Sequence, residues 1–254
     1  MWMRGLRSLV LLAVAGCVLL PAAPVLAQTS YVPYFGKNRI KYDNFKWHIY
    51  VTDHFEIYYY PEIEPHLERI AGYAESAYQQ VSADLKHDLA FKVPMVLYKT
   101  QSEFQQQNIE PTELPEGVLA FAEPYRDRMV LPIDEPSDSL YRLITHELVH
   151  IFHLDDAGGV WGALRSVLGR NALLFPNVFL PTWVHEGLAT YYESRLTPAG
   201  RVRGSLFEMA LRTAMLEGDF FSIDRVTGEP RSWPGGSTRY IYGSLFLDFL
   251  SRRY

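Results

Sequence analysis

The feature that most constrains this chain is the run His-Glu-Leu-Val-His at residues 146–150. An α-helix advances about 100° per residue, so residues four apart lie on one face, one turn from each other. On a helix, His146 and His150 can therefore bind one metal ion, and Glu147 lies close enough to hold a water molecule beside it. The spacing predicts a site with one zinc ion, which lowers the pKa of water to about 7 while Glu147 acts as general base.

A catalytic zinc needs a third protein ligand, because a five-residue pattern can also arise by chance. Asp156 follows His150 at the spacing used in metzincins, but that arrangement requires a glycine where this chain has His153. Glu186 lies in a second predicted helix, over residues 182–194. It is the other candidate for the third ligand.

Residues 181–193 resemble the gluzincins, in which a second helix after the His-Glu-x-x-His motif supplies a glutamate ligand. The pattern Trp-x-x-Glu-Gly-x-Ala-x-Tyr-x-Glu, typical of the aminopeptidase N relatives and other peptidase MA members, matches here from Trp183 to Glu193. The resemblance implies zinc binding by Glu186. We expect Gly187 and Ala189 to let this helix approach the first metal helix closely.

Other parts of the site follow from the same resemblance. Thermolysin-like gluzincins have an Asp one turn beyond the Glu ligand that orients the ligands, and the equivalent residue here is Thr190. A hydroxyl supplies no charge, so a nearby carboxylate could compensate, and the sequence leaves Asp155, Asp156 and Glu193 open.

A later helix supplies a tyrosine or histidine that stabilises the oxyanion in many gluzincins. Tyr242 is our first candidate for this role and Tyr240 the second. The segment Gly117–Phe121 could pair with an extended substrate as an added strand, or form an ordinary hairpin. The chain lacks the Gly-x-Met-Glu-Asn segment with which aminopeptidases hold a free amino terminus, so an endopeptidase is favoured over an aminopeptidase.

Apolar periodicity predicts a sheet and a long helix in an N-terminal lobe, followed by a mostly helical C-terminal lobe. The resemblance to the gluzincins implies that this is an α+β fold of the zincin type, with the metal cleft between the two lobes. The first lobe is expected to contain a hairpin at 47–60, a helix at 62–89, a strand at 93–98 and a hairpin at 117–131. Further helices are expected at 137–153, 182–194, 205–216 and 238–251.

The segment Val160–Leu180 joins the two predicted metal helices and is rich in apolar side chains. We expect it to be irregular and to pack into the helical lobe, since apolar residues of a large domain usually belong to the core. A lid over the cleft or a surface that contacts a membrane are the alternatives.

The first 27 residues have the composition of a secretory signal. Arg4 and Arg7 precede an almost wholly apolar stretch, and small residues lead to a predicted cleavage after Ala27, which leaves a metallopeptidase domain at 28–254. An uncleaved membrane anchor is one alternative. Lipidation is another, because the residues before Cys17 resemble a lipobox. The prediction implies a secreted protein of the periplasm or cell surface.

Composition excludes two classes of function. The only cysteine, Cys17, lies in the predicted signal, so the mature chain would have neither a disulfide nor a thiolate. The net charge of −5 becomes −7 once Arg4 and Arg7 are removed, and the chain contains no basic tract. Nucleic acid is therefore not an expected partner.

Beyond the metal motifs, the segments at 34–38, 55–60 and 240–250 resemble a group of secreted bacterial proteins in which a peptidase MA-like domain precedes a TolB-like β-propeller. This resemblance implies that a propeller could follow Tyr254. We expect zinc-dependent hydrolysis of a peptide or protein substrate. The alternatives are a catalytically silent peptidase-like scaffold within a larger envelope protein, and hydrolysis of an ester by the same chemistry.

Overall fold

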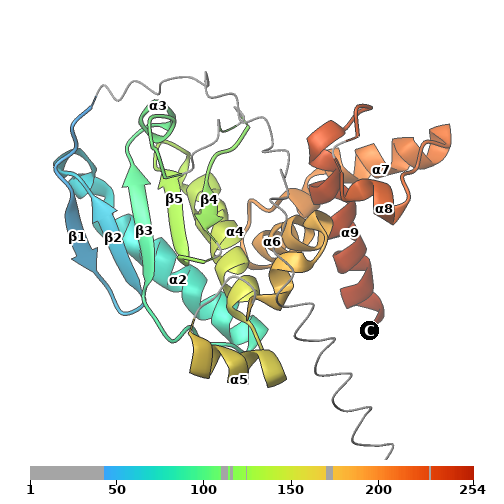
Figure 1. Cartoon of the computed structure of the whole chain (residues 1–254). Coiled ribbons are helices and arrows are strands. Elements are labelled where there is room, and N and C mark those ends of the chain that lie inside the picture. Colours follow the sequence, from blue (N-terminus) through green and yellow to red (C-terminus); the bar gives the residue numbers. More distant parts are fainter. Residues whose placement is uncertain (1–42, 110–113, 115–116, 124, 170–173, 229) are drawn as a thin grey trace, which may run out of the picture. The chain divides into compact units, whose positions relative to one another are not determined.

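The computed structural model describes residues 43–109, 114, 117–123, 125–169, 174–228 and 230–254. These residues form one mixed sheet and a set of helices, so the α+β class expected from the sequence is confirmed (Figure 1). The predicted signal peptide, Cys17 and the segment 34–38 lie outside the described residues. Within the described ranges, no helix is both long and apolar enough to span a membrane.

The sheet has five strands in the order β1-β2-β3-β5-β4. The strands are β1 (His48–Val51), β2 (Phe55–Tyr59), β3 (Val93–Tyr98), β4 (Phe121–Glu123) and β5 (Arg128–Pro132). Strands β1 and β2 form one antiparallel hairpin and β4 and β5 another, while β2, β3 and β5 are parallel. Both predicted hairpins are confirmed. The expected strand over Gly117–Phe121 is wrong in position, because β4 begins only at Phe121.

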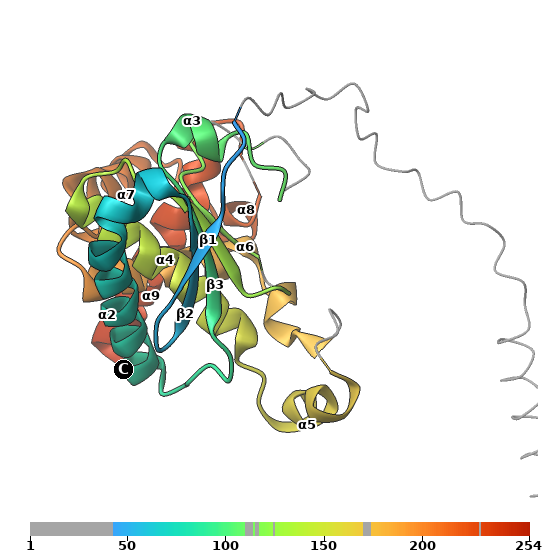
Figure 2. The ribbon, with the colours of Figure 1, turned by 90° about the vertical axis from the view of Figure 1, so that its left-hand side faces the viewer.

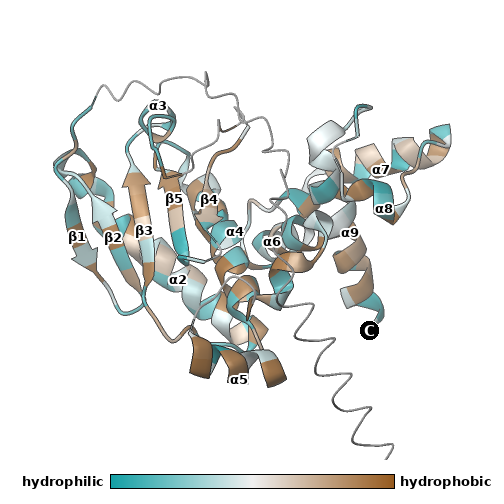
Figure 3. Ribbon diagram, viewed as in Figure 1, coloured by the Kyte–Doolittle hydropathy of each residue, from teal (hydrophilic) through white to brown (hydrophobic). Residues whose placement is uncertain are grey.

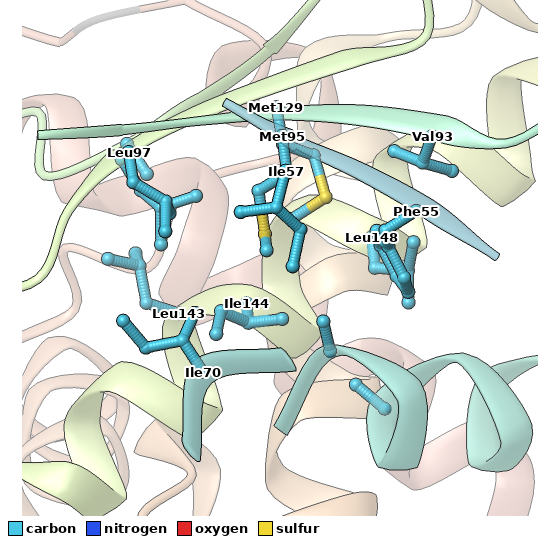
Figure 4. Packing of buried hydrophobic residues seen from close by; sticks show 14 of the residues in the cluster. Phe55, Ile57, Ile70, Val93, Met95, Leu97, Met129, Leu143, Ile144 and Leu148 are labelled. Atoms are coloured by element: carbon cyan, nitrogen blue, oxygen red, sulfur yellow. The ribbon is translucent and has the colours of Figure 1, made fainter. Parts of the chain in front are cut away.

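One face of the sheet packs against α2 (Leu67–Leu85) and α4 (Ser137–Asp155), which lie on the same side of it (Figure 2). Apolar side chains alternate along β2, β3 and β5, and every second one enters this core. Figure 4 shows Ile57, Met95 and Met129 of three strands meeting Ile70 of α2 and Ile144 of α4. The predicted helix over 62–89 is a 3-10 turn, η1 (Pro61–His66), followed by α2, which ends where Lys86 has a φ of 52°.

The other face of the sheet carries a smaller apolar cluster. Val96, Tyr98 and Val130 contribute from the strands, and Phe104 contributes from the short helix α3 (Gln101–Phe104). This helix begins at Thr100 with a capping box, in which Thr100 and Glu103 each bond the backbone N–H of the other residue. The sheet is thus covered on both sides, with α4 between it and the C-terminal helices.

The C-terminal part of the chain is helical, as predicted. Its elements are η3 (Pro176–Phe179), α6 (Thr182–Leu196), η4 (Arg201–Arg203), α7 (Ser205–Glu217), α8 (Ile223–Val226), η5 (Gly235–Ser237) and α9 (Thr238–Arg253). A second core forms where α7, α8 and α9 meet, around Phe207, Val226 and Ile241. Helix α6 packs against α4 on one side and against α9 on another (Figure 1).

Two glycines allow α6 and α9 to pack closely. A Cβ atom added at Gly187 would lie 2.6 Å from the carbonyl carbon of Gly243, and one added at Gly243 would lie 2.3 Å from the carbonyl oxygen of Trp183. The expectation that Gly187 faces the first metal helix is therefore wrong. Ala189 does join the core that α4 shares with the sheet. The close approach at Gly187 sets the position of α6 relative to α9 instead.

The segment between the metal helices differs from its prediction. Residues 159–168 form a regular helix, α5, and none of its side chains is buried. Its apolar residues Val160, Val167 and Leu168 are 73%, 81% and 65% exposed, and α5 is mostly hydrophobic in Figure 3. The polar side faces the protein, because Arg165 binds Asp155 with 2.5 Å between Nη2 and Oδ1. Among the described residues of this segment, the buried ones are Leu174 and Phe175.

Candidate metal centre

Three predicted ligands come together between α4 and α6. The Nε2 atoms of His146 and His150 are 3.3 Å apart, and each lies 3.5 Å from Oε2 of Glu186. The two histidines are one turn apart on α4, and Glu186 comes from the first half of α6, on the side that faces α4. Among the described residues, this is the one group of three or more His, Cys, Asp or Glu side chains that could hold a metal ion.

The spacing of these three atoms fits zinc. Zn–N and Zn–O bonds of about 2.0–2.1 Å in a tetrahedron place neighbouring ligand atoms about 3.3–3.4 Å apart. The observed separations of 3.3, 3.5 and 3.5 Å match this edge length without any movement of the backbone. Two imidazoles and one carboxylate form a donor set typical of catalytic zinc, which leaves a fourth position for water or substrate.

The charges of the three ligands are linked. Burial lowers the pKa of His146, but contacts with Glu186 and Glu193 outweigh burial and raise the pKa to about 9. Burial also favours the neutral form of Glu186, yet its hydrogen bonds with His146 and His150 bring its pKa well below the usual range. Glu186 is therefore ionised at neutral pH, as a metal ligand must be.

Glu147 is buried beside these ligands and lines the same cleft. Burial raises the pKa of its carboxyl group, and the neighbouring His146 and His150 oppose that change. A carboxyl group with a raised pKa accepts a proton more readily near neutral pH, which suits a general base. The structure thus places Glu147 where the helix spacing predicted it.

A carboxylate supports His146 from behind. Nδ1 of His146 lies 3.0 Å from Oε2 of Glu193, whose side chain is fully buried. When Nε2 faces the metal position, Nδ1 carries the proton and donates it to this carboxylate, which fixes the tautomer and the ring orientation. Among the three acidic residues that the sequence left open, Glu193 fills this position.

Asp155 and Asp156 lie elsewhere. Asp155 binds Arg165 and has its Oδ2 3.1 Å from Nε2 of His87, and both aspartates line a separate polar pocket with these residues. Asp156 caps the C-terminal end of α4, so its side chain is not part of the group around His146. The structure therefore favours Glu186 over Asp156 as the third ligand.

The two candidate tyrosines lie on opposite sides of α9, because residues two apart on a helix are separated by about 200°. The ring of Tyr240 stacks on His146 with 6.3 Å between the centroids, and Tyr240 lines the cleft. Burial, followed by the charge of Glu186, raises its pKa to about 12, so its hydroxyl keeps its proton at neutral pH.

Tyr242, our first choice for the oxyanion, is not brought to the cleft. Its hydroxyl accepts a hydrogen bond from the backbone N–H of Phe221 at 3.3 Å, and its ring packs on Phe220 and Phe221 in the C-terminal core. The helix face decides between the two tyrosines, and it turns Tyr242 toward α7 and α8. Tyr240 is the tyrosine in position to act.

The cleft around the ligands has a volume of about 640 Å³. Strand β4 forms part of its wall through Phe121, Ala122 and Glu123, and η3 and α9 contribute Val178 and Arg239. In the part of the chain that the structure describes, β4 pairs with β5 alone, so its other edge is open. The cleft therefore joins three candidate ligands, a buried carboxyl group and an open sheet edge.

Two further histidines lie near the ligands. His185 lines the cleft, with Nε2 3.1 Å from the carbonyl oxygen of Leu180. Its ring lies 5.2 Å from that of His153, and burial lowers the pKa of His153 to about 4. Burial also lowers the pKa of His185, so both rings are uncharged near neutral pH. The hydrogen bond from His185 holds the chain after η3 in place.

Arg201 is the main residue of the site that the sequence did not reveal. Its guanidinium bonds both carboxylate oxygens of Glu193 and lies 4.9 Å from the centre of the Tyr240 ring. It follows α6 in the 3-10 turn η4 and belongs to no recognisable motif, so no pattern in the sequence pointed to it.

Comparisons of this chain with models of protein families, with curated proteins and with solved structures found no match.

Proposed function

We propose that this protein is a zinc-dependent peptidase of the gluzincin type, in which His146, His150 and Glu186 hold one zinc ion and Glu147 is the general base. The observation that carries the proposal is the set of three ligand atoms 3.3–3.5 Å apart, facing a cleft beside a buried glutamate. The motif resemblance supports the same assignment.

Each residue has a distinct role in this proposal. A bound zinc ion would polarise the substrate carbonyl and lower the pKa of water to about 7. Glu147 takes the proton from the attacking water and later gives it to the leaving amine. Tyr240 donates a hydrogen bond to the oxygen that becomes negative, and its pKa of about 12 keeps the donor protonated. Glu193 holds His146 in the required tautomer.

The open edge of β4 favours a peptide substrate. An extended peptide can pair with the free backbone groups of an edge strand, which fixes its direction and depth in the cleft. Phe121, Ala122 and Glu123 of β4 line the same cleft as the ligands, so a peptide bonded there would pass over the zinc site. An ester lacks these repeated backbone groups and would gain less from the strand.

The decisive experiment combines metal analysis with digestion of a mixed peptide library by the wild type, by Glu147→Gln, and by the control Glu68→Gln, whose side chain is exposed on α2. We expect one zinc per chain in all three proteins. Cleavage should be retained in the control and should fall by at least about 100-fold in Glu147→Gln. The cleavage sites would then show whether the enzyme is an endopeptidase.

Each alternative gives a different result. Zinc binding at full occupancy without cleavage of peptides or esters, in the wild type, would support the scaffold role. Ester cleavage without peptide cleavage would support a different hydrolase. A protein that binds no zinc would contradict the proposal outright.

A further inference from the structure

We propose that Arg201 is a positioning residue that connects the metal ligand His146, through Glu193, to the oxyanion donor Tyr240. The inference rests on the proposed zinc site and extends it by a residue that does not touch the metal. Its basis is geometric: one guanidinium contacts the carboxylate behind the ligand, a hydroxyl on α6 and the face of the tyrosine ring.

The contacts to Glu193 form a fork. Nε of Arg201 donates to Oε1 at 2.7 Å, and Nη2 donates to Oε2 at 2.9 Å. Such a two-point contact fixes the plane of a carboxylate as well as its position. Oε2 is also the oxygen that accepts the proton from Nδ1 of His146. The orientation of the metal ligand therefore depends on the orientation of this carboxylate.

Arg201 also contacts Thr190, which carries no charge of its own. Nη2 lies 3.2 Å from Oγ1 of Thr190, the position where the thermolysin-like pattern has an aspartate. Nη2 also lies 3.1 Å from Nδ1 of His146, but both atoms are hydrogen donors when Nε2 binds metal. The guanidinium therefore bonds Glu193 and Thr190, and leaves the Nδ1 proton to the carboxylate.

Burial makes the guanidinium necessary. The side chain of Glu193 is fully buried, so its carboxylate needs a charged partner close by. Nε and Nη2 of Arg201 supply this partner at 2.7 and 2.9 Å. Among the described residues, Arg142 is the other arginine near Glu193, and its Nη1 lies at a looser 3.7 Å from Oε1. A buried carboxylate that loses its main cation would draw on other partners, including His146.

The backbone around Arg201 is built for this contact. The N–H of Arg201 itself donates to Oε1 of Glu193 at 3.2 Å, and the N–H of Val202 donates to Oγ of Ser194 at 3.0 Å. The turn can approach α6 this closely because residue 200 is glycine: a Cβ there would lie 2.0 Å from the Cα of Ser194. Gly200 therefore places the arginine.

The third contact of Arg201 is with Tyr240, which lines the cleft. The guanidinium carbon lies 4.9 Å above the ring of Tyr240, which itself stacks on His146. A cation over the ring face favours one ring position, and this position sets where the hydroxyl points. Arg201 thus holds the metal ligand and the oxyanion donor in a fixed relation.

The test makes two measurements on the full chain: zinc affinity by chelator competition, and the ¹⁵N NMR signal of the His146 Nδ1–H group. The variants are Arg201→Met, Arg201→Lys and Gly200→Ala. The control is Arg203→Met, an exposed residue of the same turn. We expect Arg201→Met to lower zinc affinity about 10–100-fold, the size typical of contacts behind a ligand. Lysine should restore part of this affinity, since it keeps the charge but not the fork.

Peptide hydrolysis adds a second readout. Arg201→Met should lower kcat more than it changes KM, because the substrate-binding edge of β4 is untouched. Wild-type zinc affinity and an unchanged His146 signal in both Arg201→Lys and Arg201→Met would overturn the role of Arg201. If Arg201→Met does not fold, Arg201→Lys alone decides, and wild-type behaviour of that variant overturns the proposal.

These outcomes separate the two proposals. A wild type that binds zinc but cuts no peptide would end the peptidase assignment, while the ranking of zinc affinities would still decide the role of Arg201. A wild type that cuts peptides and whose Arg201 variants bind zinc equally well would end only the positioning role. Failure of the wild type to bind zinc would overturn both.

Discussion

At the scale of single residues, Glu186 is the candidate ligand that would connect α4 and α6, since its Oε2 atom is 3.5 Å from both histidine nitrogens. Removing a residue that supports a ligand from behind typically lowers metal affinity about 10–100-fold. We predict that Glu186→Ala, which removes a ligand itself, lowers zinc affinity by more than this. The control Glu208→Ala, at an exposed site on α7, should bind zinc normally. Chelator competition measures both. Normal zinc binding by Glu186→Ala and weak binding by Asp156→Ala would instead favour the metzincin arrangement.

Proton release gives a second prediction at this scale. The pKa of His146 is raised to about 9, so below that pH a metal must displace a proton from this ring. Zinc binding at about pH 7.5 should therefore release about one proton from this ring, in addition to the proton lost by the zinc-bound water, and the ring's share should decrease as the pH rises through 9. Calorimetry in buffers of different ionisation enthalpy measures this number. A release no larger than the water's share at pH 7.5 would show that His146 is already neutral in the free protein.

The sequence predicted those residues that belong to a linear pattern. His146, Glu147, His150 and Glu186 lie in two helical motifs whose spacing determines which side chains face each other. Arg201 lies in no such motif, because its position depends on how a turn at Gly200 packs against α6. The sequence did not show which tyrosine faces the cleft for a related reason: the helix was predicted, but its rotation toward the cleft depends on packing against three other helices.

At the scale of elements, the contact between α6 and α9 holds Glu186 in place. We predict that Gly187→Ala lowers the free energy of unfolding by about 1–3 kcal/mol, since its Cβ would overlap the backbone of Gly243. Zinc affinity should fall as well, because residue 187 follows the ligand directly. Chemical denaturation and chelator competition measure the two effects.

The matched control for this change is Gly72→Ala. Gly72 is exposed in the middle of α2, and a Cβ there would meet no atom within 4 Å. This variant should raise the free energy of unfolding by about 0.5–1 kcal/mol, because alanine favours a helix. Equal stability changes in both variants would contradict the close packing at Gly187.

In helix α5 the side that carries Arg165 faces the protein, and this orientation predicts which substitutions destabilise the fold. Arg165→Met should lower the free energy of unfolding by up to about 3 kcal/mol, because it leaves the mostly buried Asp155 without its closest cation. Val167→Ser should change it by less than about 0.5 kcal/mol, since Val167 is 81% exposed. Denaturation curves compare the two. A larger loss from Val167→Ser would mean that the apolar side of α5 is packed.

The same helix shows where pattern analysis ends. Apolar residues in segment 160–180 suggested burial, but periodicity alone does not say which side of a helix meets the protein. An ion pair between Arg165 and Asp155 decides this, and Asp155 lies at the end of another helix. For helices with a buried apolar stripe, such as α2 and α4, most of the predicted ends lie within a few residues of the observed ends.

At the scale of the whole molecule, the candidate site joins two regions with separate cores. Helix α4 packs on the sheet, and α6 packs on α9, whose other side closes the C-terminal core. The three candidate ligands divide between these helices, with His146 and His150 on α4 and Glu186 on α6. A metal ion bound here would therefore link the sheet to the C-terminal helices, in addition to any catalytic role.

This arrangement predicts that zinc stabilises both regions together. Free zinc at 100 times its dissociation constant should add about 2.7 kcal/mol to the free energy of unfolding, which corresponds to about 5–10 °C in Tm for a domain of this size. Hydrogen exchange should slow in α4 and α6 alike, since the ion binds to both. The shift should vanish in Glu186→Ala, which keeps the histidines but breaks the link to α6. If zinc protects α4 alone in the wild type, the ion is held by the histidines without Glu186, and the two regions are not coupled through the site.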